Sequence, residues 1–460
     1  VGLSATSAQQ WPLMASPGSS VEMAQPAAPG APSGLVTTRV SVASAGAQGN
    51  AESYSPALSG DGRYVAFESL ASDLAPGDAN DEYDVFVHDR QTGQTKAISV
   101  DAAGNTGNGD SGWPAISSTG RYVTFYSSAS NLVPGDTNEA TDIFLYDRET
   151  GAMQRVSVSS SEAQANHDSY SSAVSADGRY VAFASEADTL VSGDTNGSAD
   201  IFVRDVVAGE TWRVSVASGG EQGNDASGSG VSISSDGRRV AFDSLASNLV
   251  PNDNNAQLDV FVRDWVEGWT RMASISSGGE QGNDESYIGD ISGNGQLVAF
   301  TSLADNLVPA DTNAEADAFV HDLSTHVTER VSVSSAEAQS NGGVNGVSTD
   351  EEGRLVVFDS AADDLVSGDA NGFQDVFVRD RLLGQTSLVS VATDGAQGNA
   401  DAFGGADIAD NGSVVAFESD ADNLVPGDSN EATDIFARTY SLCFTLTLQN
   451  NFDCTGCVIQ

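Results

Sequence analysis

Short hydrophobic and polar runs alternate along most of the chain, and Gly-containing turns separate them. In Tyr122–Ser127, for example, Val123 and Phe125 fall on one face, which is the period of two expected of a half-buried strand. Pairs such as Asp61-Gly62 stand between these runs and favour two-residue hairpin turns, because Asn, Asp and Gly accept a positive φ. No segment has a convincing helical period. The pattern predicts an all-β fold.

The pattern repeats. The segment Leu-Val-Pro-Gly-Asp-Thr-Asn at 132–138 recurs with small changes, and the first aspartates of successive copies lie 58 or 59 residues apart. The chain holds seven such units. Their period is too long for ankyrin, tetratricopeptide or leucine-rich repeats. Each unit reads as four short strands. In the second unit the predicted strands are Ser111–Ile116, Tyr122–Ser127, Asp142–Asp147 and Arg155–Val158.

Two phenylalanine positions recur in every unit and account for fourteen of the 18 phenylalanines. A single four-stranded sheet cannot cover its own apolar faces, so we expect these side chains to pack one sheet against the next. In the second unit they are Phe125 and Phe144.

The two ends of the repeat region predict a closed ring. The fourth-strand sequence Arg-Val-Ser-Val, or a relative of it, appears first at Arg39–Val42, before any complete unit, and no copy follows the last unit. A ring allows Arg39–Val42 to complete the last sheet, whereas an open solenoid would leave a bare edge. We therefore predict a seven-bladed β-propeller with four-stranded blades at 37–440. An Ala-, Pro- and Ser-rich extension (1–36) precedes it, and a C-terminal β-strand tail (441–460) follows.

Two segments of the third unit carry a family resemblance. Ser175–Phe183, with the sequence Ser-Ala-Asp-Gly-Arg-Tyr-Val-Ala-Phe, and Asp200–Asp205, with Asp-Ile-Phe-Val-Arg-Asp, resemble the TolB-type, WD-repeat-like propeller repeats of exported bacterial proteins. The resemblance covers 37–440. It implies the fold and leaves the function open, because such propellers include adhesins, scaffolds and enzymes. The Gly-His…Trp-Asp signature of true WD repeats is absent, and so is a segment like the Tol-interaction domain of TolB.

The long loop of every unit contains Asp-x-Asn-x-x-x-Asp without substitution. Hard oxygen ligands at the first, third and seventh positions of a tight loop suit calcium, and the variable fifth position could add a backbone carbonyl. The sequence therefore predicts about one Ca²⁺ per blade. The predicted ligands are Asp78, Asn80, Asp84, Asp136, Asn138, Asp142, Asp194, Asn196, Asp200, Asp253, Asn255, Asp259, Asp311, Asn313, Asp317, Asp369, Asn371, Asp375, Asp428, Asn430 and Asp434.

The alternative to calcium is a set of Asx turns, in which Asp and Asn side chains bond nearby backbone amides and no ion binds. That alternative accounts less readily for the second aspartate, since two unpaired carboxylates repel at close range. Magnesium suits carbonyl-rich loops poorly, and zinc would require His or Cys. Asp89 and its counterparts, at the twelfth position, are expected to shape the hairpin that ends at Gly93.

Charge and composition narrow the range of partners. The chain has 65 acidic and 19 basic residues, a formal net charge of −46, which disfavours nucleic acid and anionic membranes. No stretch approaches the roughly 18 apolar residues of a spanning helix. The chain starts at Val1 rather than Met, which we interpret as processing after export, so the predicted location is extracellular, at a bacterial cell surface.

The C-terminal tail favours assembly. Phe444, Leu446 and Leu448 alternate with polar residues, as in an amphipathic strand that could pair with the same chain or with a neighbour. Cys443, Cys454 and Cys457 are the candidates for a disulfide. The principal hypothesis is a secreted, calcium-binding structural protein that forms homo-oligomers or filaments through its terminal extensions.

An enzyme is the second hypothesis. No nucleophile elbow, His-Glu-x-x-His motif or phosphate loop occurs, and the four histidines fall at different places in their units, so a non-enzymatic role is favoured. The alternative is a propeller enzyme or lectin-like module that acts on an extracellular polysaccharide. Its active site would lie at the central channel, with Asp290 or Asp407 as candidates.

Overall fold

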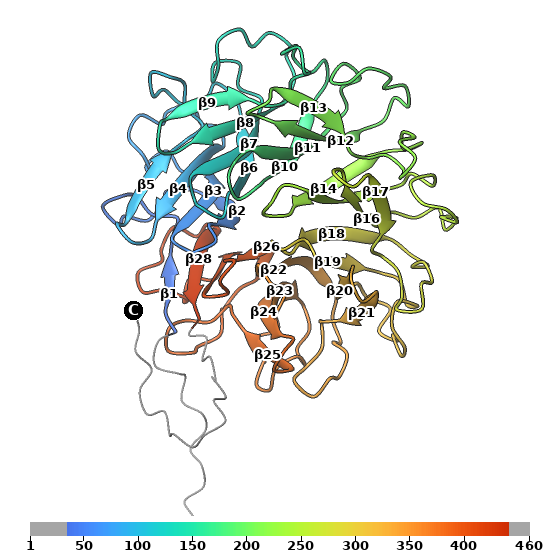
Figure 1. The fold of residues 1–460 in the computed structure, drawn as a ribbon. Coiled ribbons are helices and arrows are strands. Elements are labelled where there is room, and N and C mark those ends of the chain that lie inside the picture. The colour runs from blue at the N-terminus through green and yellow to red at the C-terminus, as the bar shows by residue number, and fades with distance from the viewer. Residues whose placement is uncertain (1–34, 441–460) are drawn as a thin grey trace, which may run out of the picture.

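The computed structural model describes residues 35–440, which form seven four-stranded antiparallel sheets arranged around a central axis (Figure 1). We number the blades in chain order, with β2–β5 as blade 1. The predicted seven-bladed β-propeller is confirmed, and 35–440 contain no helix. In the described part of the chain no helix is therefore long and apolar enough to cross a membrane. Residues 1–34 of the predicted extension and the whole predicted tail at 441–460, with its strand and three cysteines, lie outside the described residues.

Each blade has one strand beside the axis and three strands progressively further out. The innermost strands are β2 (Ser53–Leu58), β6 (Ser111–Ile116), β10 (Ser169–Val174), β14 (Ser227–Ile233), β18 (Ser286–Ile291), β22 (Val344–Thr349) and β26 (Ala402–Ile408). The second strands are β3 (Tyr64–Ser69), β7 (Tyr122–Ser127), β11 (Tyr180–Ser185), β15 (Arg239–Ser244), β19 (Leu297–Ser302), β23 (Leu355–Ser360) and β27 (Val414–Ser419). The third strands are β4 (Asp84–Asp89), β8 (Asp142–Asp147), β12 (Asp200–Asp205), β16 (Asp259–Asp264), β20 (Asp317–Asp322), β24 (Asp375–Asp380) and β28 (Asp434–Thr439). The outer strands are β5 (Gln94–Ala97), β9 (Ala152–Arg155), β13 (Glu210–Arg213), β17 (Trp269–Met272), β21 (Val327–Arg330), β25 (Gln385–Leu388) and, in blade 7, β1 (Thr37–Arg39).

The outer strands begin earlier than the sequence pattern predicts. In blade 2 the pattern predicts Arg155–Val158, whereas β9 spans Ala152–Arg155. The strand follows its hairpin directly, and after Val156 the chain leaves the sheet, so that Ser157 turns its hydroxyl onto the first residue of β8. The Arg-Val-Ser-Val signature therefore marks the exit from a blade rather than its fourth strand.

The N-terminal strand closes the ring, as predicted, with the same shift in register. Thr37 and Arg39 of β1 pair with Arg438 and Phe436 of β28, in place of the predicted Arg39–Val42 segment. Val40 continues the ladder by one hydrogen bond, from its amide to the carbonyl of Ile435 at 2.7 Å. The first described strand and the last thus belong to one sheet.

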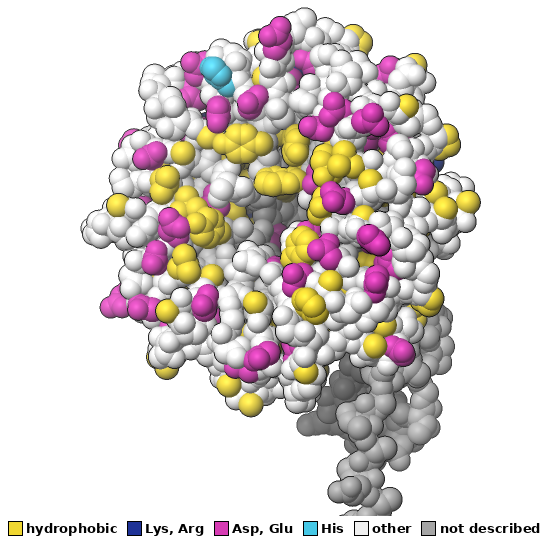
Figure 2. Space-filling view, turned by 180° about the vertical axis from the view of Figure 1, so that it is seen from behind, with side chains coloured by type: hydrophobic (Ala, Val, Ile, Leu, Met, Phe, Trp, Pro, Cys, Tyr) yellow, Lys and Arg dark blue, Asp and Glu magenta, His cyan; other side chains and the backbone are white. Residues whose placement is uncertain are grey.

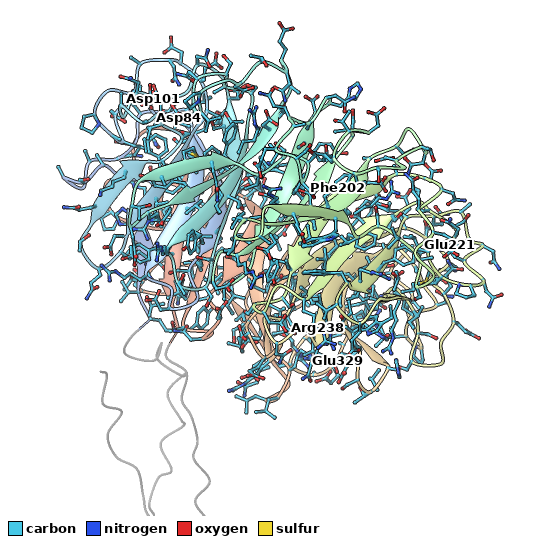
Figure 3. All side chains as sticks on the ribbon, turned by 45° about the horizontal axis from the view of Figure 1, so that its top comes forward. Asp84, Asp101, Phe202, Glu221, Arg238 and Glu329 are labelled. Atoms are coloured by element: carbon cyan, nitrogen blue, oxygen red, sulfur yellow. The ribbon has the colours of Figure 1, made fainter. Side chains whose placement is uncertain are left out.

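The paired phenylalanines form the core, as expected. Phe67 of β3 and Phe86 of β4 are register partners, and their rings stack with centroids 5.8 Å apart. They are fully buried in a cluster that includes Val414 and Ile435 of blade 7, so they join neighbouring blades. Phe202, labelled in Figure 3, has the same place in blade 3.

The innermost strands are irregular in every blade. Each of them shows a register shift against its neighbour. In the first three blades a residue other than glycine has a positive φ there: Ser55 at 55°, Trp113 at 45° and Ser171 at 47°. Such backbone is strained for residues with a Cβ, and its concentration at the channel wall directs attention to that wall.

Candidate functional site

The predicted calcium loops connect the second strand to the third in each blade, and their last aspartate begins the third strand. Asp84, labelled in Figure 3, is the first residue of β4 and is fully buried. Its carboxylate accepts hydrogen bonds from the Ser99 hydroxyl at 2.5 Å and from the Asn80 amide at 2.9 Å. The sequence therefore places this carboxylate inside the blade, where it orders the start of the strand.

The asparagine of the loop is fully engaged by the protein. In blade 1 the side-chain amide of Asn80 donates to Asp84 and to the carbonyl of Gly107, and its oxygen accepts the amide hydrogen of Glu82 at 3.3 Å. The same three contacts recur in all seven blades. This geometry matches the Asx-turn alternative for the asparagine.

In four blades an arginine lies between the two aspartates. In blade 2 Nη1 of Arg155, the last residue of β9, is 2.9 Å from Asp136 and 2.8 Å from Asp142. All three side chains are at least nine-tenths buried. The equivalent arginines of blades 3, 5 and 7 are Arg213, Arg330 and Arg39. In these four blades a guanidinium thus supplies the positive charge that calcium was predicted to supply.

Blades 1, 4 and 6 have no such arginine, because Ala97, Met272 and Leu388 stand at its place in the register. Burial raises the pKa of Asp84 in blade 1 and of Asp375 in blade 6 to about 6, and the first aspartate of each loop, Asp78 or Asp369, adds to the effect. Within 35–440 no group of three or more His, Cys, Asp or Glu side chains is arranged to hold a metal. Calcium at the 21 loop residues stays a prediction.

Asp89 has the hairpin role expected of it. Its carboxylate forms two hydrogen bonds with the Arg63 guanidinium, at 2.9 and 2.7 Å, and accepts the amide hydrogen of Gln91. The Arg63 guanidinium holds the pKa of Asp89 well below its usual range. The residue fixes the turn to β5 and lies at the opposite end of β4 from Asp84.

A second candidate site lies on the propeller axis. The innermost strands enclose a cavity of about 320 Å³ that Asp290 and Asp407 border. Five of the seven blades carry Ala or Ser at the position that these two residues hold. In blade order the seven residues are Ala57, Ala115, Ala173, Ser232, Asp290, Ser348 and Asp407. The channel is therefore asymmetric, with a polar arc over blades 4 to 7 and an apolar arc over blades 1 to 3.

Hydrogen bonds link the members of the polar arc. The Ser348 hydroxyl lies between the two carboxyls, 2.9 Å from Oδ1 of Asp407 and 3.5 Å from Oδ2 of Asp290. Asp290 also accepts from the Ser232 hydroxyl at 2.6 Å, and Asp407 accepts the amide hydrogen of Leu58 in blade 1 at 2.7 Å. Burial raises the pKa of Asp290 to about 6 and that of Asp407 to about 7. The two acids are thus close to each other and titrate near neutrality.

Two further buried acids, Glu68 and Glu418, lie at the ends of β3 and β27, just before the long loops that carry the predicted calcium ligands. Ser55 donates its amide hydrogen to Glu418 and its hydroxyl hydrogen to Glu68, both at 2.9 Å. Glu68 also accepts the amide hydrogen of Trp113 at 2.9 Å. Ser55 and Trp113 are the strained residues of β2 and β6, so the carboxylates stabilise the irregular backbone. Burial raises the pKa of Glu418 to about 8.

Aromatic side chains stand at the same ends of five innermost strands. We call them the aromatic collar: Tyr54, Trp113, Tyr170, Tyr287 and Phe403. Trp113 is 52% exposed and Tyr287 is 40% exposed, although both are large and partly apolar. Tyr54 and Phe403 also line a cleft of about 690 Å³ between blades 7 and 1, beside Glu52 and Asp420. Figure 2 shows hydrophobic and acidic side chains around a hollow at the centre of one face, with almost no Lys or Arg.

The sequence predicted Asp290 and Asp407 as channel residues, but it did not predict the aromatic collar. Both aspartates depart from the repeat at a position where the other units have Ala or Ser, and this departure is visible in the sequence. Tyr54, Tyr170, Tyr287 and Phe403 share one repeat position, and Trp113 stands next to it. The other three units have Gly112, Gly228 and Asn345 at that position, which interrupts the aromatic pattern in the sequence. The collar therefore becomes evident only when the blades are arranged around the axis.

No protein-family model matches the chain, and no relative is found among curated proteins. Among solved structures, an oligogalacturonate lyase in complex with manganese has a TM-score of 0.53 and 12% identity, over 90% of this chain and 95% of that one. The Vibrio parahaemolyticus oligogalacturonate lyase has a TM-score of 0.50 and 13% identity, over 89% and 95%. TolB from Acinetobacter baumannii is 15% identical over 66% of this chain, with a TM-score of 0.40, and the match spans only 58% of TolB.

Fold and topology define the class as a seven-bladed β-propeller. Its repeat sequences resemble those of TolB-type propellers, and TolB proteins are among its structural neighbours. At these identities the likeness establishes the fold alone.

The principal functional hypothesis is wrong on this comparison. Two matches that cover 95% of the matched chain, with TM-scores of 0.50 and 0.53, are oligogalacturonate lyases, which are enzymes and not structural filaments. The prediction of a non-enzymatic role relied on the absence of known catalytic motifs and on the scattered histidines, and the prediction of assembly relied on the C-terminal tail. The weakness of the first prediction is that motif searches miss a site built from different blades, and at the channel wall two of the seven blades carry a carboxylate.

Proposed function

We propose that the protein is an enzyme that cleaves an extracellular polysaccharide at the central channel, with Asp290 and Asp407 as its acid–base pair. The observation that carries the proposal is the placement of these two carboxyls on either side of the Ser348 hydroxyl, at the wall of the axial cavity. Hydrolysis of a glycosidic bond commonly uses two carboxyl groups, one to protonate the leaving oxygen and one to activate water.

The pKa values suit this chemistry. A catalytic acid works best when its pKa is near the operating pH, and burial raises the pKa of Asp407 to about 7. Asp290, whose pKa is raised to about 6, is ionised over more of the neutral range and serves as the base. In this scheme Asp290 takes a proton from water, and the water oxygen bonds to the sugar carbon. The bond between that carbon and the leaving oxygen breaks, and the leaving oxygen receives the proton of Asp407.

The aromatic collar supplies the binding surface. Aromatic rings offer flat apolar faces, and the hydroxyl of Tyr adds a polar tip, which suits the mixed faces of a sugar chain. The oligogalacturonate lyases suggest a polysaccharide substrate, but the charge of the channel does not suit the substrate in their name. Oligogalacturonate is acidic, whereas Asp290, which is ionised in this scheme, and the formal net charge of −46 would repel a carboxylate at this channel. We therefore propose an uncharged polysaccharide as substrate.

Activity assays on a panel of soluble glucans, xylans, mannans and pectate test the proposal. We expect new reducing ends from an uncharged glycan, a rate optimum between about pH 6 and 7, and a loss of roughly 100-fold or more in kcat for D407N and for D290N. W113A should raise KM with less effect on kcat, because it removes binding surface.

The control is D394N, which changes a carboxylate in an exposed turn outside the channel and should leave the rate unchanged. Pectate cleaved by elimination, with the uncharged glycans untouched, would contradict the substrate and the reaction. Activity that survives both D290N and D407N would remove the channel acids from the mechanism.

A further inference from the structure

The seven loops are not equivalent, and the outer strand decides what lies between their aspartates. We propose that the three loops without an arginine, in blades 1, 4 and 6, each bind one calcium ion, and that the arginine takes the place of the ion in the other four. This inference is independent of the channel chemistry, since the loops lie at the ends of the third strands and contribute no residue to the axial cavity.

The four arginine blades show that the aspartate pair holds a positive charge. In each of them one guanidinium nitrogen contacts both carboxylates at between 2.8 and 3.3 Å. Two carboxylates at this separation, inside a blade, repel each other unless a cation stands between them. The arginine is therefore an internal stand-in for an ion.

Blade 6 has the same pair without an arginine, and the side-chain amide of Gln397 donates to Oδ1 of Asp369 at 3.3 Å. Leu388 occupies the position that Arg330 has in blade 5, opposite Phe377 in the register. Oδ2 of Asp369 is closed off from solvent and has no hydrogen-bond partner. A buried carboxylate oxygen without a partner is unfavourable, and an oxygen-binding cation would satisfy it.

The neighbouring glutamine does not replace the cation. In blade 4 the side-chain amide of Gln281 reaches Asp253 at 2.7 Å and Asp259 at 2.8 Å. In blade 3, however, Gln222 makes the same two contacts while Arg213 is also present. The glutamine can therefore bind the two aspartates together with a positive charge. Because its amide is neutral, it does not balance the negative charge of the two aspartates. Blade 1 has Thr106 at this position and Ala97 at that of the arginine.

The ion would take carboxylate oxygens from the two aspartates, with water and backbone carbonyls completing its shell. The loop asparagine would not contribute, since both ends of its side-chain amide already have partners. A site with only two carboxylate ligands suggests dissociation constants of order 10⁻⁴–10⁻³ M.

Exchanging residues between blades tests the inference. L388R gives blade 6 the arginine of blade 5, and R330L gives blade 5 the leucine of blade 6. Calcium is counted by equilibrium dialysis of the full chain in about 0.15 M KCl, which screens diffuse binding to the acidic surface. Sites are located in crystals grown with millimolar CaCl₂.

We expect three ions for the unchanged protein, two for L388R and four for R330L, with the density for the ion lost at Asp369 and gained at Asp311. Calcium should raise the Tm of R330L more than that of L388R. If R330L fails to fold without calcium, its refolding on addition of calcium is the equivalent result. Seven ions, no ions, or a count that neither variant changes would overturn the inference. Each of these outcomes is distinct from any result of the glycan assays.

Discussion

At the scale of single residues, the channel acids show how burial sets chemistry. Asp407 and Asp290 lie 117 positions apart in the chain, and each bonds to residues of the blades on both sides of its own. Their hydrogen bonds lower the pKa of each group, and desolvation outweighs them. The balance keeps a protonated acid present at neutral pH, which an exposed aspartate would not provide.

This balance predicts a pH dependence of stability. The folded pKa of Asp407 is about 7, above the value of 3.8 for an unperturbed aspartate. Between these values the unfolded chain has lost the proton that the folded protein retains, so the contribution of Asp407 to stability is complete below about pH 4 and is lost as pH rises towards 7. Asparagine does not ionise. We therefore expect the Tm of D407N, relative to the unchanged protein, to rise between pH 5 and pH 8 in thermal unfolding.

The same exposed control, D394N, should follow the unchanged protein at every pH. A difference between D407N and the unchanged protein that is constant from pH 5 to pH 8 would show that Asp407 does not titrate in this range.

At the scale of elements, the turn between the first two strands is where one blade meets its neighbour. Gly178 has a φ of 72°, and a Cβ there would lie 2.1 Å from the ring of Tyr122 in the preceding blade. The Asp-Gly and Asn-Gly pairs seen in the sequence therefore serve two purposes, the hairpin turn and the contact between blades. The first follows from local geometry and was predicted; the second depends on the ring.

Substitutions at two glycines separate these purposes. Gly220 also has a positive φ, of 92°, but a Cβ at that position would have no neighbouring atom within 4 Å. G220A should cost about 1 kcal/mol, for the strained backbone alone. G178A should cost about 2–4 kcal/mol, because the displaced Tyr122 adds an overpacking penalty.

Chemical or thermal unfolding of both variants measures these free energies. Equal losses for G178A and G220A would mean that the contact with Tyr122 contributes nothing.

At the scale of the whole molecule, the ring depends on a strand that is remote in sequence. Nearly four hundred residues separate β1 from β28, whereas each other outer strand follows its partner through a short hairpin. Arg39 of β1 also places its guanidinium between Asp428 and Asp434, so that the closing strand brings its own counter-charge. The seam between blades 7 and 1 is thus held by pairing and by charge.

Proline at matched positions tests this closure. The amide hydrogens of Val40 and Val214 make equivalent bonds, to Ile435 at 2.7 Å and to Ile201 at 2.8 Å, and both side chains are 1% exposed. V40P and V214P each remove one such bond. We expect V40P to lower the Tm more and to expose the N-terminal segment to limited proteolysis, because a released β1 opens the ring, whereas β13 remains tethered by its hairpin. Equal Tm losses would argue against a special role for closure.

The amino-acid sequence by itself determined what depends on local pattern and on its repetition. Alternation, Asp-Gly turns and paired phenylalanines define a blade, and the 58–59-residue period repeats it. The first copy of the Arg-Val-Ser-Val motif stands before any complete unit and so indicates a closed ring. Each of these signals lies in neighbouring residues or in their spacing. Tertiary structure decided what depends on juxtaposition. The guanidinium of Arg155 between two aspartates, Asp290 beside Asp407 and the aromatic collar bring together side chains from different strands or blades. Spacing along the chain does not encode these distances, since they arise only when the sheets pack around one axis.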